Sequence, residues 1–139
     1  EWKGVGSGAP GEGVGGSTFR FELDGHVLVR RSFNDTPEAD GRPAAHHEDL
    51  LVLTPASDGV RASAVYFDNE GHVIRYDAAW SAGGSALTFT SVDGGPAPRF
   101  RLTYAFPSPD EAKVTFEVAP PGGEFRPYVG GVLRRAGGR

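Results

Sequence analysis

The residues best equipped for chemistry lie in one short run, His46-His47-Glu48-Asp49. Neighbouring side chains of a β-strand point to opposite faces, so the two histidines should face opposite ways, each with the acidic residue two positions further on. An imidazole near an aromatic cavity titrates close to neutral pH and can act as a general acid or base. His47 is therefore the candidate catalytic residue if the protein is an enzyme.

The same run could bind a metal only with help from other parts of the chain. Two ligands at positions i and i+2 can contact one ion, but a stable zinc site usually needs three or four protein ligands. Further imidazoles would have to come from His26 and His72, on other expected strands. The sequence contains no cysteine, so thiolate ligands, disulfides and cysteine nucleophiles are excluded. No metal site is predicted.

A tight hairpin places an arginine among apolar side chains. Asp24-Gly25 separates two β-rich runs and favours a two-residue turn, because both positions need positive φ. In that register Phe21 lies opposite Leu28, and Arg30 lies opposite Phe19. A buried Arg30 would need a carboxylate or an anionic ligand as partner. A β-bulge, or a position at the rim of the sheet, would instead leave its charge in water.

A second hairpin gathers aromatic residues on one face. The segment Asp68-Asn69-Glu70-Gly71 joins the expected strands 60–67 and 72–80, and the register places Ala64 opposite Tyr76. Large residues opposite small ones can fill a narrow barrel, and hydroxyl groups on such a face can orient a flat apolar ligand. The expected ligand-binding residues are Phe21, Arg30, Tyr66, Tyr76, Trp80 and Tyr104.

The whole pattern predicts an all-β protein, an antiparallel up-and-down meander β-barrel of about 8–10 strands, calycin- or lipocalin-like, as a single domain over residues 1–139. Residues 7–16 and 34–45 are expected to be loops, and residues 107–111 could form a single helical turn. The expected strands are 17–23, 26–33, 46–54, 60–67, 72–80, 85–92, 99–106, 112–118 and 125–135, with a short one around 2–6.

The amino-acid composition limits the classes of binding partner that we expect. A formal net charge of −4 gives no basic surface for nucleic acid, and no apolar run approaches the ~20 residues of a membrane helix. Neither nucleic acid nor a membrane is an expected partner, and the sequence leaves room for a homodimer. The expected location is the cytoplasm, although the absence of an initial methionine is also compatible with a removed leader.

Two short segments carry a family resemblance. The opening Trp2-Lys3-Gly4-Val5-Gly6 resembles the start of nitrobindin-like proteins, and 21–29 with 66–71 resembles hairpins of bacterial calycin-like domains. The resemblance implies a ligand-holding barrel. Nitrobindin-like proteins bind haem through a histidine near the chain end, but this sequence has no histidine after His72. Haem is therefore disfavoured, and no cofactor is predicted.

The function expected from these observations is binding of a small hydrophobic or aromatic organic ligand inside the barrel. The first alternative is a small barrel enzyme of the cyclase or isomerase type, which confines its substrate and uses a histidine or tyrosine as proton donor or acceptor. The second alternative is a non-enzymatic interaction domain with a solid core.

Overall fold

The computed structural model describes residues 2–7, 13–92 and 95–137, and most of these residues lie in ten β-strands. The strands are β1 (Trp2–Ser7), β2 (Val14–Glu22), β3 (Val27–Thr36), β4 (Ala45–Pro55), β5 (Arg61–Asp68), β6 (Val73–Trp80), β7 (Ala86–Ser91), β8 (Arg99–Ser108), β9 (Glu111–Ala119) and β10 (Arg126–Arg135).

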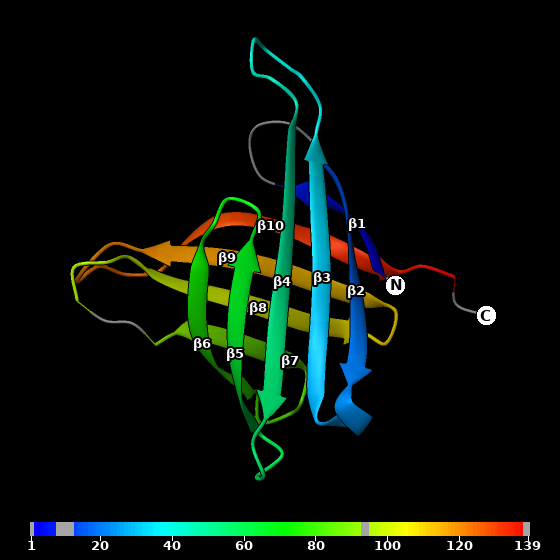
Figure 1. The fold of residues 1–139 in the computed structure, drawn as a ribbon, viewed down its shortest axis with the longest axis vertical. Helices are drawn as coiled ribbons and strands as arrows, with labels where there is room; N and C mark the ends of the chain where they lie inside the picture. Colours follow the sequence, from blue (N-terminus) through cyan, green and yellow to red (C-terminus); the bar gives the residue numbers. More distant parts are fainter. Residues whose placement is uncertain (1, 8–12, 93–94, 138–139) are drawn as a thin grey trace.

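The strands form one closed antiparallel barrel in which each strand pairs with its neighbours in the chain and β1 pairs with β10. In Figure 1, β2 to β6 lie roughly vertical with alternating directions, and β7 to β10 cross behind them at a steep angle. The predicted all-β meander barrel is confirmed, with ten strands. This architecture is compatible with a calycin-like fold.

Both predicted hairpin registers are confirmed. Phe21 pairs with Leu28 and Phe19 with Arg30 across the first hairpin. The second hairpin pairs Ala64 with Tyr76. In the first turn, which includes the short 3-10 segment η1 (Leu23–Gly25), φ is 56° at Asp24 and 89° at Gly25. Glycine and aspartate are among the residues that best tolerate this left-handed backbone, which explains why the chain reverses here.

The core lies on the barrel axis and combines large side chains with small ones. Tyr76 lies opposite Ala64 in one strand pair, and Phe89 lies opposite Ala78 in another. This alternation lets aromatic rings reach the centre of a narrow barrel without overlap. The buried core residues are Leu51, Leu53, Ala64, Tyr76, Ala78, Phe89, Leu102, Tyr104 and Ala112.

Three sequence expectations for local structure were wrong. The glycine-rich segment 7–16 is not a loop throughout, because β1 runs to Ser7 and β2 begins at Val14. Backbone pairing with strands on both sides offsets the poor strand propensity of glycine in Val14-Gly15-Gly16. Residues 8–12 of that expectation lie outside the described residues.

The loop expected at 34–45 is shorter, because β3 continues to Thr36 and β4 begins at Ala45. The helical turn expected at 107–111 does not form, because Ser108 pairs with Glu111 across a tight strand turn. Within residues 2–7, 13–92 and 95–137, η1 is the only helical segment. No described helix has the length and apolar character required to cross a membrane.

Candidate ligand-binding site

Arg30 on β3 is the charged group at the centre of the barrel. Its side chain faces inward and is only 5% exposed. Nη2 donates a hydrogen bond to the Asp49 carboxylate on β4, and Nη1 donates to the Tyr104 hydroxyl on β8. Burial opposes the charge on Arg30, but Tyr104 and Asp49 outweigh it and raise the pKa of Arg30 above its usual value. Of the two alternatives for Arg30, the bulge or rim position is therefore wrong, and the buried position with a carboxylate partner is the one observed.

A chain of polar contacts continues from Asp49 toward one end of the barrel. His47 lies on the same inner face of β4, with Nε2 3.8 Å from the Asp49 carboxylate and 3.1 Å from the Tyr66 hydroxyl. Its other ring nitrogen, Nδ1, lies 3.2 Å from Glu70. His46 faces outward instead and contacts Asp35. The two histidines point to opposite faces, as predicted.

Asp68 anchors the turn between β5 and β6 and ends this chain of contacts. Its carboxylate accepts hydrogen bonds from the Tyr66 hydroxyl at 3.1 Å and from the backbone N–H groups of Glu70 and His72 at 3.0 and 2.9 Å. Burial, together with the charges of Asp49 and Asp68, raises the pKa of Tyr66 well above its usual value. Tyr66 therefore remains a neutral hydrogen-bond donor at physiological pH.

The polar end of the barrel comprises His47, Tyr66, Asp68, Glu70 and His72. A metal ion has no evident place in it, because no group of three or more histidine, aspartate or glutamate side chains in the described part of the chain is arranged to hold one.

The opposite end of the barrel is apolar and aromatic. Antiparallel neighbours alternate in direction, so the even-numbered strands β2, β6 and β8 all end at the same opening. Their last inward-facing residues are aromatic and include Phe19, Phe21, Trp80 and Phe106. Phe21 remains 67% exposed, Trp80 40% and Phe19 38%. We call these four residues the aromatic mouth.

The ring of Tyr104 forms the floor of the aromatic mouth. Phe19 packs edge-on against it with ring centroids 6.0 Å apart, and Phe106 stacks on it at 6.4 Å. Trp80 packs against Phe106 at 5.8 Å. Because the Tyr104 hydroxyl accepts a hydrogen bond from Arg30, the apolar opening lies directly against the buried charged group.

The structure separates the residues predicted from the sequence into three places. Phe21 and Trp80 lie in the aromatic mouth, while Arg30, Tyr76 and Tyr104 lie at the packed centre. The remaining two, Tyr66 and His47, belong to the polar end. Sequence reasoning left Phe19 and Phe106 out of the site, although the strand alternation had placed both on the inward face.

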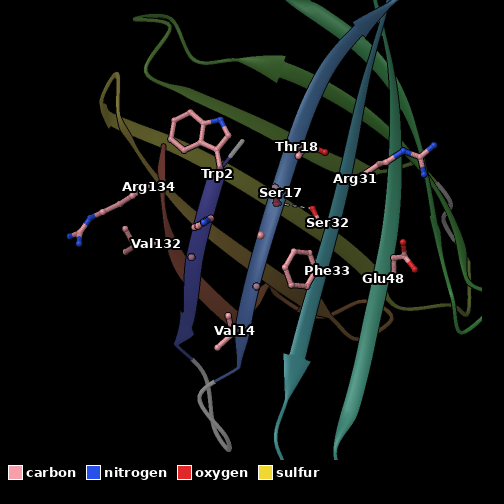
Figure 2. Close-up of a pocket in the computed structure, with 14 residues that line it drawn as sticks. Trp2, Val14, Ser17, Thr18, Arg31, Ser32, Phe33, Glu48, Val132 and Arg134 are labelled. Atoms are coloured by element: carbon pink, nitrogen blue, oxygen red, sulfur yellow. Dashed lines mark hydrogen bonds between the residues drawn. The ribbon is translucent and has the colours of Figure 1, made fainter. Parts of the chain in front are cut away.

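A groove of about 610 Å³ lies on the outside of the barrel, across β10, β1, β2, β3 and β4 (Figure 2). It exists because Gly16 carries no side chain and the ring of Phe33 lies against it: a Cβ at Gly16 would be 2.9 Å from Phe33 Cε1. Sequence reasoning missed this groove, although extending the first hairpin register would have paired these residues. The apolar lining includes Val14, Phe33 and Val132, and the charged residues are Lys3, Arg31, Glu48 and Arg134.

Comparison with known proteins does not identify the chain, since no protein-family model matches it and no curated protein is significantly similar to it. Its class is therefore defined by structure: a closed ten-stranded meander barrel with an aromatic opening above a buried arginine.

Proposed function

We propose that this protein binds a small apolar or aromatic organic molecule at the aromatic mouth of its barrel. The observation that carries the proposal is the exposure of inward-facing aromatic residues: Phe21 is 67% exposed and Trp80 is 40% exposed. Aromatic side chains that face the barrel axis and still contact water offer apolar surface that a ligand can cover. Meander barrels of this size can hold one small ligand at their mouth.

The packed centre limits how deep the ligand can go. Tyr76 and Phe89 are each only 2% exposed, and Tyr104 closes the floor of the mouth. The ligand of this proposal therefore places a flat ring on Phe106 or Phe19, and it does not occupy a large interior cavity.

Intrinsic fluorescence tests the proposal. The chain has two tryptophans, so a Trp2→Phe variant leaves Trp80 in the mouth as the only reporter. Titration with a panel of small aromatic hydrocarbons and aromatic ketones should change Trp80 emission with saturation. Phe21→Ala should weaken binding about tenfold, the equivalent of roughly 1.4 kcal/mol of lost apolar contact.

The matched control is Val73→Ala, because Val73 is also exposed but begins β6 at the opposite end of the barrel. It should leave affinity unchanged. Equal loss in the two variants, or a linear unsaturable response across the whole panel, would remove the aromatic mouth as the binding site.

The second candidate function is proton-transfer catalysis at the polar end. It is favoured by His47, whose two ring nitrogens lie 3.1 Å from the Tyr66 hydroxyl and 3.2 Å from Glu70. Such contacts on both ring nitrogens hold an imidazole in one orientation. His47 lies six residues before Leu53 on β4, about 20 Å from the level of the mouth, so its substrate would enter from the other end. A folded His47→Ala variant that keeps turnover of a substrate found by screening would eliminate this candidate.

A further inference from the structure

The centre of the barrel holds more hydrogen-bond donors than acceptors. Arg30 donates one hydrogen bond from Nη1 to the Tyr104 hydroxyl and one from Nη2 to the Asp49 carboxylate. Its buried Nε–H has no acceptor among the residues that the structure describes. An unpaired buried donor costs about 1–3 kcal/mol, so such groups in native proteins are normally satisfied by something. Arg30 Nε is therefore a position where an acceptor is expected.

Two tyrosine hydroxyls add to this surplus. The Tyr104 hydroxyl already accepts from Arg30, so its own proton remains available for donation. Tyr76 is 2% exposed, and its hydroxyl is a second donor in the core cluster that contains Tyr104. Both tyrosine rings pack edge-on against Phe89, with centroids 6.1 and 6.2 Å away.

Packing against Phe89 places Tyr76 beside Tyr104 in the centre of the barrel. Burial raises the pKa of Tyr76 to about 12; the charge of Arg30 acts to lower it, and those of Asp49 and Tyr104 act to raise it. The hydroxyl of Tyr76 is thus a neutral donor. Arg30 Nε and the hydroxyls of Tyr104 and Tyr76 are three donors of the packed centre, and the Tyr104 ring joins this centre to the aromatic mouth.

Charge balance decides which kind of acceptor suits this region. Asp49 already neutralises Arg30, so a carboxylate ligand would bring a second, uncompensated negative charge into a low-dielectric interior next to Asp49. A carbonyl oxygen has two lone pairs and no net charge, so it can accept two of these hydrogen bonds without that cost.

We infer that the ligand of the aromatic mouth is a neutral aromatic carbonyl compound, whose ring lies among Phe19, Trp80 and Phe106 and whose oxygen accepts hydrogen bonds from Arg30 Nε and a tyrosine hydroxyl. This inference rests on the proposed function, because it assigns a chemical class to the molecule that binds there. Tyr104 links the mouth to the donors, because its ring contacts Phe19 and Phe106 and its hydroxyl contacts Arg30, so the oxygen of the ligand would enter beside this ring.

Three probes of the same shape test the inference: 2-acetylnaphthalene, 2-ethylnaphthalene and 2-naphthoate, which are a ketone, a hydrocarbon and a carboxylate. Their dissociation constants are measured by equilibrium dialysis at pH 7. The ketone should bind about tenfold more tightly than the hydrocarbon, since each net hydrogen bond contributes about 0.5–1.5 kcal/mol. The carboxylate should bind more weakly than either. The infrared carbonyl stretch of the bound ketone should move to lower frequency than in an apolar solvent.

Tyr76→Phe removes one donor and keeps the ring that packs on Phe89. It should lower the ketone affinity several-fold and leave the hydrocarbon affinity unchanged. The matched control is Tyr128→Phe, which removes a hydroxyl from a tyrosine that is 74% exposed and lies on β10. The control should change neither affinity.

The outcomes separate the two proposals. If the hydrocarbon binds at least as well as the ketone and the carbonyl stretch is unshifted, the carbonyl inference is wrong, the donors are served by buried water, and the proposed function survives. Tightest binding by the carboxylate would also overturn the inference, in favour of an acidic ligand. If none of the three probes binds to the folded protein, ligand binding at the mouth is itself rejected.

Discussion

Arg30 and Asp49 meet inside the barrel although they are not register partners. Arg30 pairs with Leu51 across the strands, and Asp49 pairs with Ser32. The ion pair is therefore diagonal, and it turns the guanidinium along the barrel axis, where Nη1 also reaches Tyr104 on the far side. One side chain thus joins three strands, β3, β4 and β8.

Removing the charge of Asp49 should strongly destabilise the protein. In Asp49→Asn the cation of Arg30 remains buried without its counter-charge, a situation that typically costs about 3–5 kcal/mol. Urea unfolding followed by circular dichroism measures the loss. Asp77→Asn, at an exposed aspartate of β6, should change the free energy of unfolding by less than about 0.5 kcal/mol.

The double variant Arg30→Met with Asp49→Leu separates the electrostatic effect of the ion pair on stability from the effect of packing. Replacing both charged partners by apolar residues is often neutral or stabilising. The double variant should therefore be more stable than Asp49→Asn alone. A double variant as unstable as the single one would mean that shape, and not an uncompensated charge, explains the loss.

The stability contributed by Asp68 should depend on pH. Burial alone would raise the pKa of Asp68, but hydrogen bonds from His72, Tyr66 and Glu70 outweigh it and hold that pKa below its ordinary value. A folded-state pKa below the unfolded value of about 3.9 stabilises the protein above that value, and the gain is lost as pH falls through the folded-state pKa.

The free energies of unfolding of the parent and Asp68→Asn proteins should therefore differ most above about pH 5 and converge in more acidic solution. Urea titrations at a series of pH values measure this difference. A difference that stays constant down to pH 2.5 would contradict the assigned role of the carboxylate, and Asp77→Asn again provides the control.

Gly16 should not tolerate a side chain while Phe33 is present. A Cβ at Gly16 would lie 2.9 Å from Phe33 Cε1 and 3.2 Å from the backbone oxygen of Trp2. Gly16→Val should therefore destabilise by about 1–3 kcal/mol through overpacking. Phe33→Ala should relieve part of this cost in a double-mutant cycle, whereas Gly83→Ala, at a glycine with open space around it, should have little effect.

Phe89 should be the most sensitive aromatic residue of the barrel centre. It is 2% exposed and lies between the rings of Tyr76 and Tyr104. Phe89→Ala should cost about 3–5 kcal/mol, because the rigid barrel wall cannot collapse into the space left behind. Thermal unfolding measures this loss of stability. The control is Phe67→Ala, on the outer face of β5 and 41% exposed, which should destabilise the protein much less. Equal costs would place the packed centre elsewhere.

The sequence was sufficient to predict the registers of the two hairpins, because each register depends on a short stretch of chain around its turn. Asp24-Gly25 fixes the turn, and from it follow the pairs of Phe21 with Leu28 and Phe19 with Arg30. The opposite orientations of His46 and His47 follow equally well from the two-residue period of a strand.

The contact of Arg30 with Tyr104 could not be predicted in this way. It joins residues 74 positions apart, and depends on how far each strand is displaced along its neighbour when the barrel closes. For the same reason the aromatic residues were expected to line one pocket, whereas Phe21 lies in the aromatic mouth and Tyr66 belongs to the polar end.

The pairing of β1 with β10 sets the order in which the protein can be completed during synthesis. Trp2 pairs with Arg135, so the seam of the sheet forms only after β10 has left the ribosome. Until then β1 has a free edge, and the aromatic interior is open to neighbouring chains. The barrel is thus most vulnerable to aggregation between the synthesis of β9 and the pairing of β10, when a chaperone that shields β1 would help it most.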